Sequence, residues 1–235
     1  MNKKYTAQEM REMEAIVASG DIGQMTRETV AKMLRQAAEM RDRCEEKRKE
    51  LGKMIVVNLF GGPGCGKSTG AAHIFSRLKQ SGVSCELVTE VAKGYVWDGA
   101  PNLLHDQTLV LAQQYHNLRR LEGLVDVAIT DSPIILSNIY LKNDPKWGVG
   151  THPFELFSYA LHNQFDNRNY FLRRFKPYER VGRCELEEDA RKLDGEIKKL
   201  VGNTFDSYKE VDGNSMGYEQ IVSDVLDILR KQRST

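Results

Sequence analysis

A glycine-rich segment, Gly61–Ser68 (GGPGCGKS), fits the pattern G-x-x-x-x-G-K-[ST] in full. Its glycines let successive backbone N–H groups curl around phosphate oxygens in conformations that a Cβ atom would obstruct. Lys67 can reach the β- and γ-phosphate oxygens of a nucleotide, and the hydroxyl of Ser68 can ligate Mg²⁺. The motif therefore predicts a site for ATP with Mg²⁺. The predicted nucleotide contacts in and after this loop are Gly62, Gly64, Cys65, Gly66, Lys67, Ser68 and Thr69.

Asp131 ends the apolar segment Val127–Asp131, where a P-loop protein places the carboxylate that holds Mg²⁺ through water. The guanine-reading sequence N-K-x-D of GTPases is absent. ATP-driven motors carry a Glu directly after this Asp to polarise water, but here Ser132 follows. The pattern favours transfer of a phosphoryl group to an acceptor over hydrolysis, with Lys67 and Asp131 among the catalytic residues and Ser68 and Asp131 as metal ligands.

Two further segments resemble the AAA_28 group of P-loop proteins, which are common in phages and related to ribosylnicotinamide kinases. Leu87–Tyr95 (LVTEVAKGY) is similar to the group's E-V-A-[RK]-x-Y element. Lys176–Arg183 (KPYERVGR), followed by the acidic Glu185–Ala190, is similar to its lid and post-lid helix. The resemblance covers roughly residues 54–230 and implies a kinase-type sheet and phosphoryl transfer to a small acceptor. The group is functionally mixed, so the identity of the acceptor does not carry over.

Glu90 lies just after the second predicted strand. In nucleoside kinases, which look similar here, a carboxylate at this point orients the acceptor hydroxyl and accepts its proton. The alternative is a surface Glu that caps the next helix. Tyr95, Trp97 and Asp98 could line an acceptor pocket, or the two aromatic residues could belong to the core.

The segment His105–Leu109 opens the helix that follows the acceptor loop. Gln107 could read the edge of a base, whereas Asp106 is better explained as the helix cap. Gln113 and Gln114 continue this helix, and either could face the pocket.

Basic residues gather between a predicted strand and a helix, where kinases of this architecture place a closing lid. We expect the lid around residues 173–184, with Arg180 and Arg183 neutralising charge on the transferring phosphoryl group and Arg173 contacting the nucleotide. A solvated charged face is the alternative. The basic residues concerned are Arg173, Arg174, Lys176, Arg180 and Arg183.

Strands that alternate with helices must position these residues. The predicted strands are Met54–Phe60, Cys85–Thr89, Val125–Thr130, Tyr170–Leu172 and Tyr208–Val211. The predicted helices of the same region are Ser68–Leu78, Asp106–Leu121, Pro153–Phe165, Glu185–Leu200 and Glu219–Arg230. Such alternation predicts an α/β fold, a P-loop NTPase with a parallel sheet of about five strands covered by helices.

Residues 1–50 differ from the kinase domain expected over 51–235. Apolar positions recur at helical intervals on both sides of the breaking segment Ser19–Gly23, which predicts a helical hairpin. Its apolar stripe needs a partner surface, either the core of the same chain or a second copy in a homodimer.

Composition excludes several classes of protein. Of the 235 residues, 40% are hydrophobic and 29% charged, which supports a core and argues against global disorder. No segment is apolar enough for a signal peptide or a membrane span, and the four scattered cysteines fit a reducing cytoplasm, that of a host cell if the protein is viral. The formal net charge of +1 counts against a kinase of modified bases in DNA, because polymer binding needs a broad basic track. A nucleotide-gated regulatory module remains a third reading.

Overall fold

The computed structural model describes residues 53–142, 151–175 and 187–233, together with the helical positions Lys32, Arg35, Gln36 and Glu39. Contacts divide the chain into two units, Met1–Glu46 and Lys47–Thr235. Beyond those four positions, the predicted N-terminal hairpin lies outside the described residues, as do residues 176–186, which include Arg180 and Arg183. Within the described part of the chain, no helix has the length and apolar character needed to cross a membrane.

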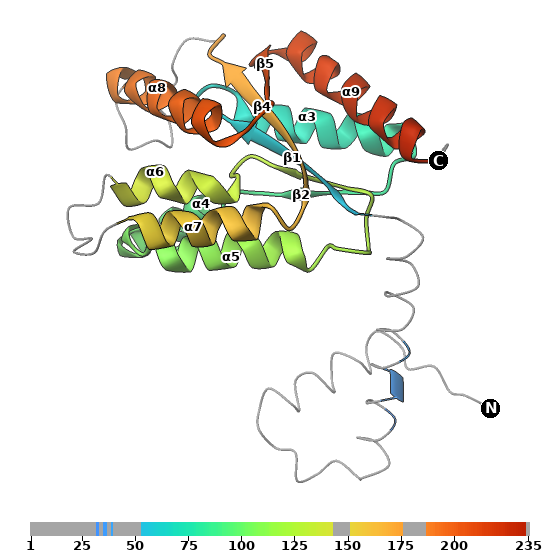
Figure 1. Cartoon of the computed structure of the whole chain (residues 1–235), viewed down its shortest axis with the longest axis horizontal. Helices are drawn as coiled ribbons and strands as arrows, with labels where there is room; N and C mark the ends of the chain where they lie inside the picture. The colour runs from blue at the N-terminus through green and yellow to red at the C-terminus, as the bar shows by residue number, and fades with distance from the viewer. Residues whose placement is uncertain are drawn as a thin grey trace. The chain divides into compact units, whose positions relative to one another are not determined.

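Five parallel strands form one sheet in the order β2-β3-β1-β4-β5 (Figure 1). The strands are β1 (Ile55–Phe60), β2 (Cys85–Val88), β3 (Val127–Thr130), β4 (Asp166–Arg173) and β5 (Lys209–Asp212). All six residues of β1 are buried, because this strand pairs with β3 on one side and β4 on the other. The predicted α/β class and the parallel sheet of about five strands are confirmed.

Helices cover both faces of this sheet. Residues Ile55, Val57 and Leu59 of β1 share a hydrophobic cluster with residues of α3 (Lys67–Gln80) and α9 (Ser215–Arg233), which lie together in Figure 1. Val56 and Phe60 of β1 belong to hydrophobic clusters on the other face. The helices there are α5 (Gln107–Arg119), α6 (Ser137–Lys142), α7 (His152–His162) and α8 (Glu187–Thr204). The short elements α4 (Val91–Trp97), η2 (Pro101–His105) and η3 (Ile134–Leu136) complete the described fold.

Strand β4 is longer than the sequence predicts, eight residues instead of three. Its first half is polar, and two of those polar side chains face a polar partner on β1. The amide of Asn58 donates to the side-chain oxygens of Asn167 at 2.8 Å and Asn169 at 3.0 Å. These bonds stabilise a polar strand segment inside the sheet. The prediction missed this segment because it depended on an apolar pattern, which polar residues do not give.

Candidate active site

The segment Gly61–Ser68 connects β1 to α3, as the motif predicts. Gly66 is the residue before the first turn of α3 and has φ of 101°, a left-handed conformation that L residues with side chains rarely adopt. A Cβ atom at Gly66 would also clash with the hydroxyl of Tyr218, which donates to the Gly66 carbonyl at 3.0 Å. Tyr218 of α9 therefore stabilises the conformation in which the loop joins α3. The positive end of the α3 helix dipole lies at the loop.

Lys67 reaches back across the loop. Its ammonium group donates to the carbonyl oxygens of Gly61 at 2.6 Å and Gly62 at 2.9 Å. An ammonium group has three N–H donors, so these two bonds leave one for an anion in the loop. The side chain is thus fixed in place before any phosphate arrives.

The pKa of Lys67 lies above its ordinary value. Burial by itself lowers this pKa, but it is outweighed by the electrostatic influence of four neighbours, Cys65, Tyr140, Glu90 and Asp131. Lys67 therefore keeps its positive charge at neutral pH. The same interactions show that the structure brings Lys67, Glu90 and Asp131, three of the predicted catalytic residues, within electrostatic range of one another.

Asp131 directly follows β3 and is only 4% exposed. Its Oδ1 atom is buried and has no hydrogen-bond partner among the described residues. A buried carboxylate oxygen without a partner is costly, and a cation or its bound water would satisfy it. The hydroxyl of Ser68, on the first turn of α3, offers the second oxygen ligand that the sequence predicts. The residues present therefore fit Mg²⁺, which in nucleotide sites takes few protein oxygens and fills its other positions with phosphate and water.

Glu90 immediately precedes α4, but its side chain makes no capping hydrogen bond to that helix. The capping alternative is therefore wrong. Gln114, a buried residue of α5, holds this turn in place. Its Oε1 accepts from the backbone N–H of Val91 at 3.4 Å, and its Nε2 donates to the hydroxyl of Thr130 at 3.1 Å. One side chain thus links the turn at Glu90 to the strand end at Asp131.

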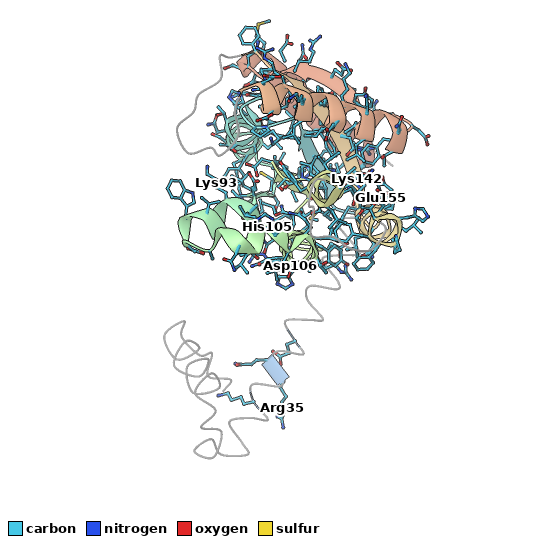
Figure 2. All side chains as sticks on the ribbon, turned by 90° about the vertical axis from the view of Figure 1, so that its left-hand side faces the viewer. Arg35, Lys93, His105, Asp106, Lys142 and Glu155 are labelled. Carbon is cyan, nitrogen blue, oxygen red and sulfur yellow. The ribbon has the colours of Figure 1, made fainter. Side chains whose placement is uncertain are left out.

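The elements around the predicted acceptor pocket are α4, η2 and the start of α5, where Figure 2 labels Lys93, His105 and Asp106. The Asp106 carboxylate accepts from the Leu109 N–H at 3.0 Å, so the predicted cap is confirmed. Trp97 is 74% exposed, so the core interpretation is wrong for this residue. The hydroxyl of Tyr95 donates to Gln113 at 2.6 Å.

Gln107 is buried at the start of α5. Its Nε2 donates to the Leu104 carbonyl at 2.6 Å, whereas its buried Oε1 has no partner among the described residues. An unpaired amide oxygen of this kind can accept a hydrogen bond, as the predicted reading of a base edge requires.

Two predicted nucleotide contacts are used differently in the structure. The guanidinium of Arg173 forms an exposed ion pair with Asp212 at 2.9 Å, so it is directed to the end of β5. The backbone amide of Gly62 donates to the carboxylate of Asp194 at 2.7 Å.

Three residues that contact the loop were missed in the sequence: Arg174, Asp194 and Tyr218. Arg174 stood among the basic residues of the expected lid, and Asp194 is one of many charged residues on its helix. Tyr218 was missed because the last helix was predicted to begin at Glu219, four residues after its observed start at Ser215. No local motif marks these residues, since each acts through a contact distant in sequence.

No protein-family model matches this sequence, and none of the curated proteins matches it. Among solved structures, the chain is similar to a deoxyadenosine kinase from M. mycoides with bound dATP, with 18% sequence identity, a TM-score of 0.49, and coverage of 73% of this chain and 99% of that one. It is also similar to APE1195, with 20% identity, a TM-score of 0.37, and coverage of 76% and 96%. Neither likeness is close enough to carry a functional conclusion. The resemblance to the AAA_28 group thus stands on the quoted motifs alone.

Proposed function

We propose that this chain is an ATP-dependent phosphotransferase that moves the γ-phosphoryl group of ATP to a hydroxyl or phosphate of a nucleoside, nucleotide or related small metabolite. The observation that carries the proposal is the common environment of Lys67, Glu90 and Asp131 beside the phosphate loop. It combines a charged ammonium with a buried carboxylate oxygen suited to Mg²⁺ and a second carboxylate that does not cap its helix.

Each group has a distinct role in this reaction. The loop amides and the remaining N–H of Lys67 bind the phosphates and stabilise the charge that develops on the transferring group. Ser68 and Asp131 would hold Mg²⁺, which when bound neutralises charge on the β- and γ-phosphates. Glu90 orients an acceptor hydroxyl and accepts its proton as the phosphoryl group leaves ATP. Arg180 and Arg183 are proposed to add positive charge from the lid.

Transfer is favoured over hydrolysis by the residue after Asp131. Ser132 stands where a motor protein would place a water-activating Glu, and its backbone N–H donates to the hydroxyl of Thr130 at 3.1 Å. Glu90 lies on a different connection, after β2, beside the elements of the predicted acceptor pocket. Its carboxylate is therefore better suited to a bound acceptor than to a water molecule aligned on ATP.

An acceptor screen combined with a loop variant tests this proposal. ADP release is measured with nucleosides, mononucleotides, nicotinamide riboside and oligonucleotides, for the wild type and for Lys67→Ala. We expect one class of small acceptor to stimulate ADP release, and Lys67→Ala to lower the stimulated rate about 100-fold or more, as is usual when a charge-stabilising group is lost.

Lys79→Ala is the matched control, because Lys79 is an exposed lysine on the same helix. It should keep the wild-type rate. Turnover by Lys67→Ala near the wild-type rate would contradict the assignment of Gly61–Ser68 as the loop that binds the phosphates of ATP. Stimulation by oligonucleotides alone would point to bases within DNA, and ATP binding without any stimulation would point to a regulatory module.

A further inference from the structure

Two residues distant in sequence meet the first half of the phosphate loop. Oδ1 of Asp194, on α8, accepts a hydrogen bond from the backbone N–H of Gly62 at 2.7 Å. Arg174, directly after β4, donates to the Pro63 carbonyl at 2.8 Å. The two side chains also pair with each other, at 3.0 Å from Nε and 2.9 Å from Nη2 to Oδ2 of Asp194. Arg174 is 8% exposed and Asp194 20%, so this ion pair is largely shielded from solvent.

The glycine at position 62 is explained by this contact. Gly62 has no positive φ, so its backbone conformation does not require glycine. A Cβ atom there would lie 2.5 Å from Oδ1 of Asp194 and 2.7 Å from the carbonyl oxygen of Ala190. Helix α8 therefore approaches the loop so closely that only glycine fits.

The charge of Asp194 needs compensation at this place. A carboxylate next to a phosphate site repels phosphate, and the Arg174 guanidinium cancels that charge while it binds the loop carbonyl. Lys67 and Tyr218 hold other carbonyls of the same loop, those of Gly61, Gly62 and Gly66. Among the contacts described above, only Asp194 bonds the amide of Gly62 and only Arg174 bonds the carbonyl of Pro63.

We propose that Asp194 and Arg174 are positioning residues that hold the phosphate loop in its nucleotide-binding shape, with Arg174 also masking the carboxylate from the phosphates. This inference rests on the proposed ATP binding. A loop that is in its binding shape for only a fraction of the time binds ATP more weakly by that fraction.

The test measures the Kd for ATP with Mg²⁺ by calorimetry on the full chain. Asp194→Asn should bind ATP about 10-fold more weakly, the effect expected when a hydrogen-bond acceptor that also pairs with Arg174 loses its charge. Arg174→Gln should bind more weakly still, because it leaves the carboxylate uncompensated. The double variant should bind ATP more tightly than Arg174→Gln, since no uncompensated carboxylate remains beside the phosphates. Arg174→Lys, which keeps the charge, should recover part of the affinity that Arg174→Gln loses.

The matched control is Glu210→Gln, which breaks the exposed pair between Lys198 of the same helix and β5, 2.8 Å in length. It should leave ATP affinity unchanged. A purely structural role of Asp194 and Arg174 would lower the melting temperature of these four variants and leave the Kd for ATP at the wild-type value. That result, or a double variant that is weaker than both single variants, would overturn the proposal.

A second measurement does not depend on ATP. Amide hydrogen exchange at Gly62, followed by NMR in glycine-labelled protein without nucleotide, should be slow in the wild type and fast in Asp194→Ala, which removes the acceptor of the Gly62 N–H. Equal exchange in both would overturn the link between Asp194 and the loop. If the wild type binds no ATP yet shows this difference, the proposed function fails while the contact between α8 and the loop holds.

Discussion

Lys67, Glu90 and Asp131 come from the connections that follow β1, β2 and β3, and these three strands are neighbours in the sheet. The carboxyl ends of parallel strands lie at one edge, so three residues spread over 65 positions of the chain reach one site. The motif alone predicts Lys67 and its loop. The position of Glu90 depends in addition on Gln114, whose two hydrogen bonds join β3 to the turn before α4.

Glu90→Gln should leave ATP affinity nearly unchanged, because the loop and Lys67 carry that binding. Phosphorylation of the acceptor should fall by roughly 10²–10⁴-fold, the usual range for a positioned acid or base. Background ATP hydrolysis should change much less. Single-turnover kinetics with and without acceptor measure both rates, with Glu86→Gln of β2 as the control.

A Glu90 that activated water would lose hydrolysis and transfer together in this experiment. A Glu90 with only a structural role would lower the melting temperature without the selective loss of transfer. An unchanged rate of acceptor phosphorylation would make Asp98 or Asp131 the next candidate for the base.

At the scale of the elements, the sequence predicts what is buried and apolar. All five strands were found: β1, β2 and β3 are mainly apolar runs and β4 ends in one. The fifth, β5, is mostly charged and has Val211 as its buried residue. The polar half of β4 was missed because its asparagines pair with Asn58, a contact 109 residues away. Helix α4 was missed because it spans only seven residues, too few for a helical repeat of apolar positions to stand out. The residues that fix the loop, Asp194 and Tyr218, carry no local signal for the same reason as β4: their partners are distant in sequence.

Helix α7 carries a buried titratable group. His162 is 2% exposed and its Nε2 atom has no partner among the described residues. Burial lowers the pKa of His162 from its ordinary 6.5 to about 4. Between these values the unfolded chain binds a proton that the folded chain does not, so stability is complete above pH 6.5 and falls as the pH drops toward 4. The loss over the whole interval is about 3 kcal/mol.

Urea unfolding at pH 7 and pH 5 measures this effect. The carboxylates whose pKa is lowered in the fold, Glu155, Glu210 and Glu219, lose their contribution only below about pH 4.5 and do not interfere. His162→Gln should abolish most of the drop in stability between the two pH values. His116→Gln, at an exposed position of α5, should keep it. An equal drop in the wild type and in His162→Gln would contradict the assignment.

At the scale of the whole molecule, the chain is nearly neutral, with 34 basic and 33 acidic residues among Lys, Arg, Asp and Glu. The net charge therefore provides no bulk attraction to a polyanion. The proposed binding of ATP depends on local groups such as the phosphate loop. The unit Lys47–Thr235 contains the sheet and every described residue of the proposed site. Residues 1–50 were predicted to brace the core or to mediate self-association, and this remains a prediction.

Deletion of residues 1–50 tests that prediction. Because the apolar stripe of the predicted hairpin needs a partner surface, we expect the shortened chain to have fewer subunits by light scattering or a lower melting temperature. An unchanged number of subunits, melting temperature and rate of acceptor phosphorylation would show that the segment does neither.

The central claim is that the loop, Lys67 and Glu90 transfer a phosphoryl group to an acceptor and not to water. The most direct measurement follows the label from [γ-³²P]ATP in the presence of the acceptor found by the screen. We predict that most of the label appears on the acceptor in the wild type, and that in Glu90→Gln the labelled acceptor falls while labelled inorganic phosphate stays near its background level. Label that appears only as inorganic phosphate, whatever acceptor is supplied, would contradict the account.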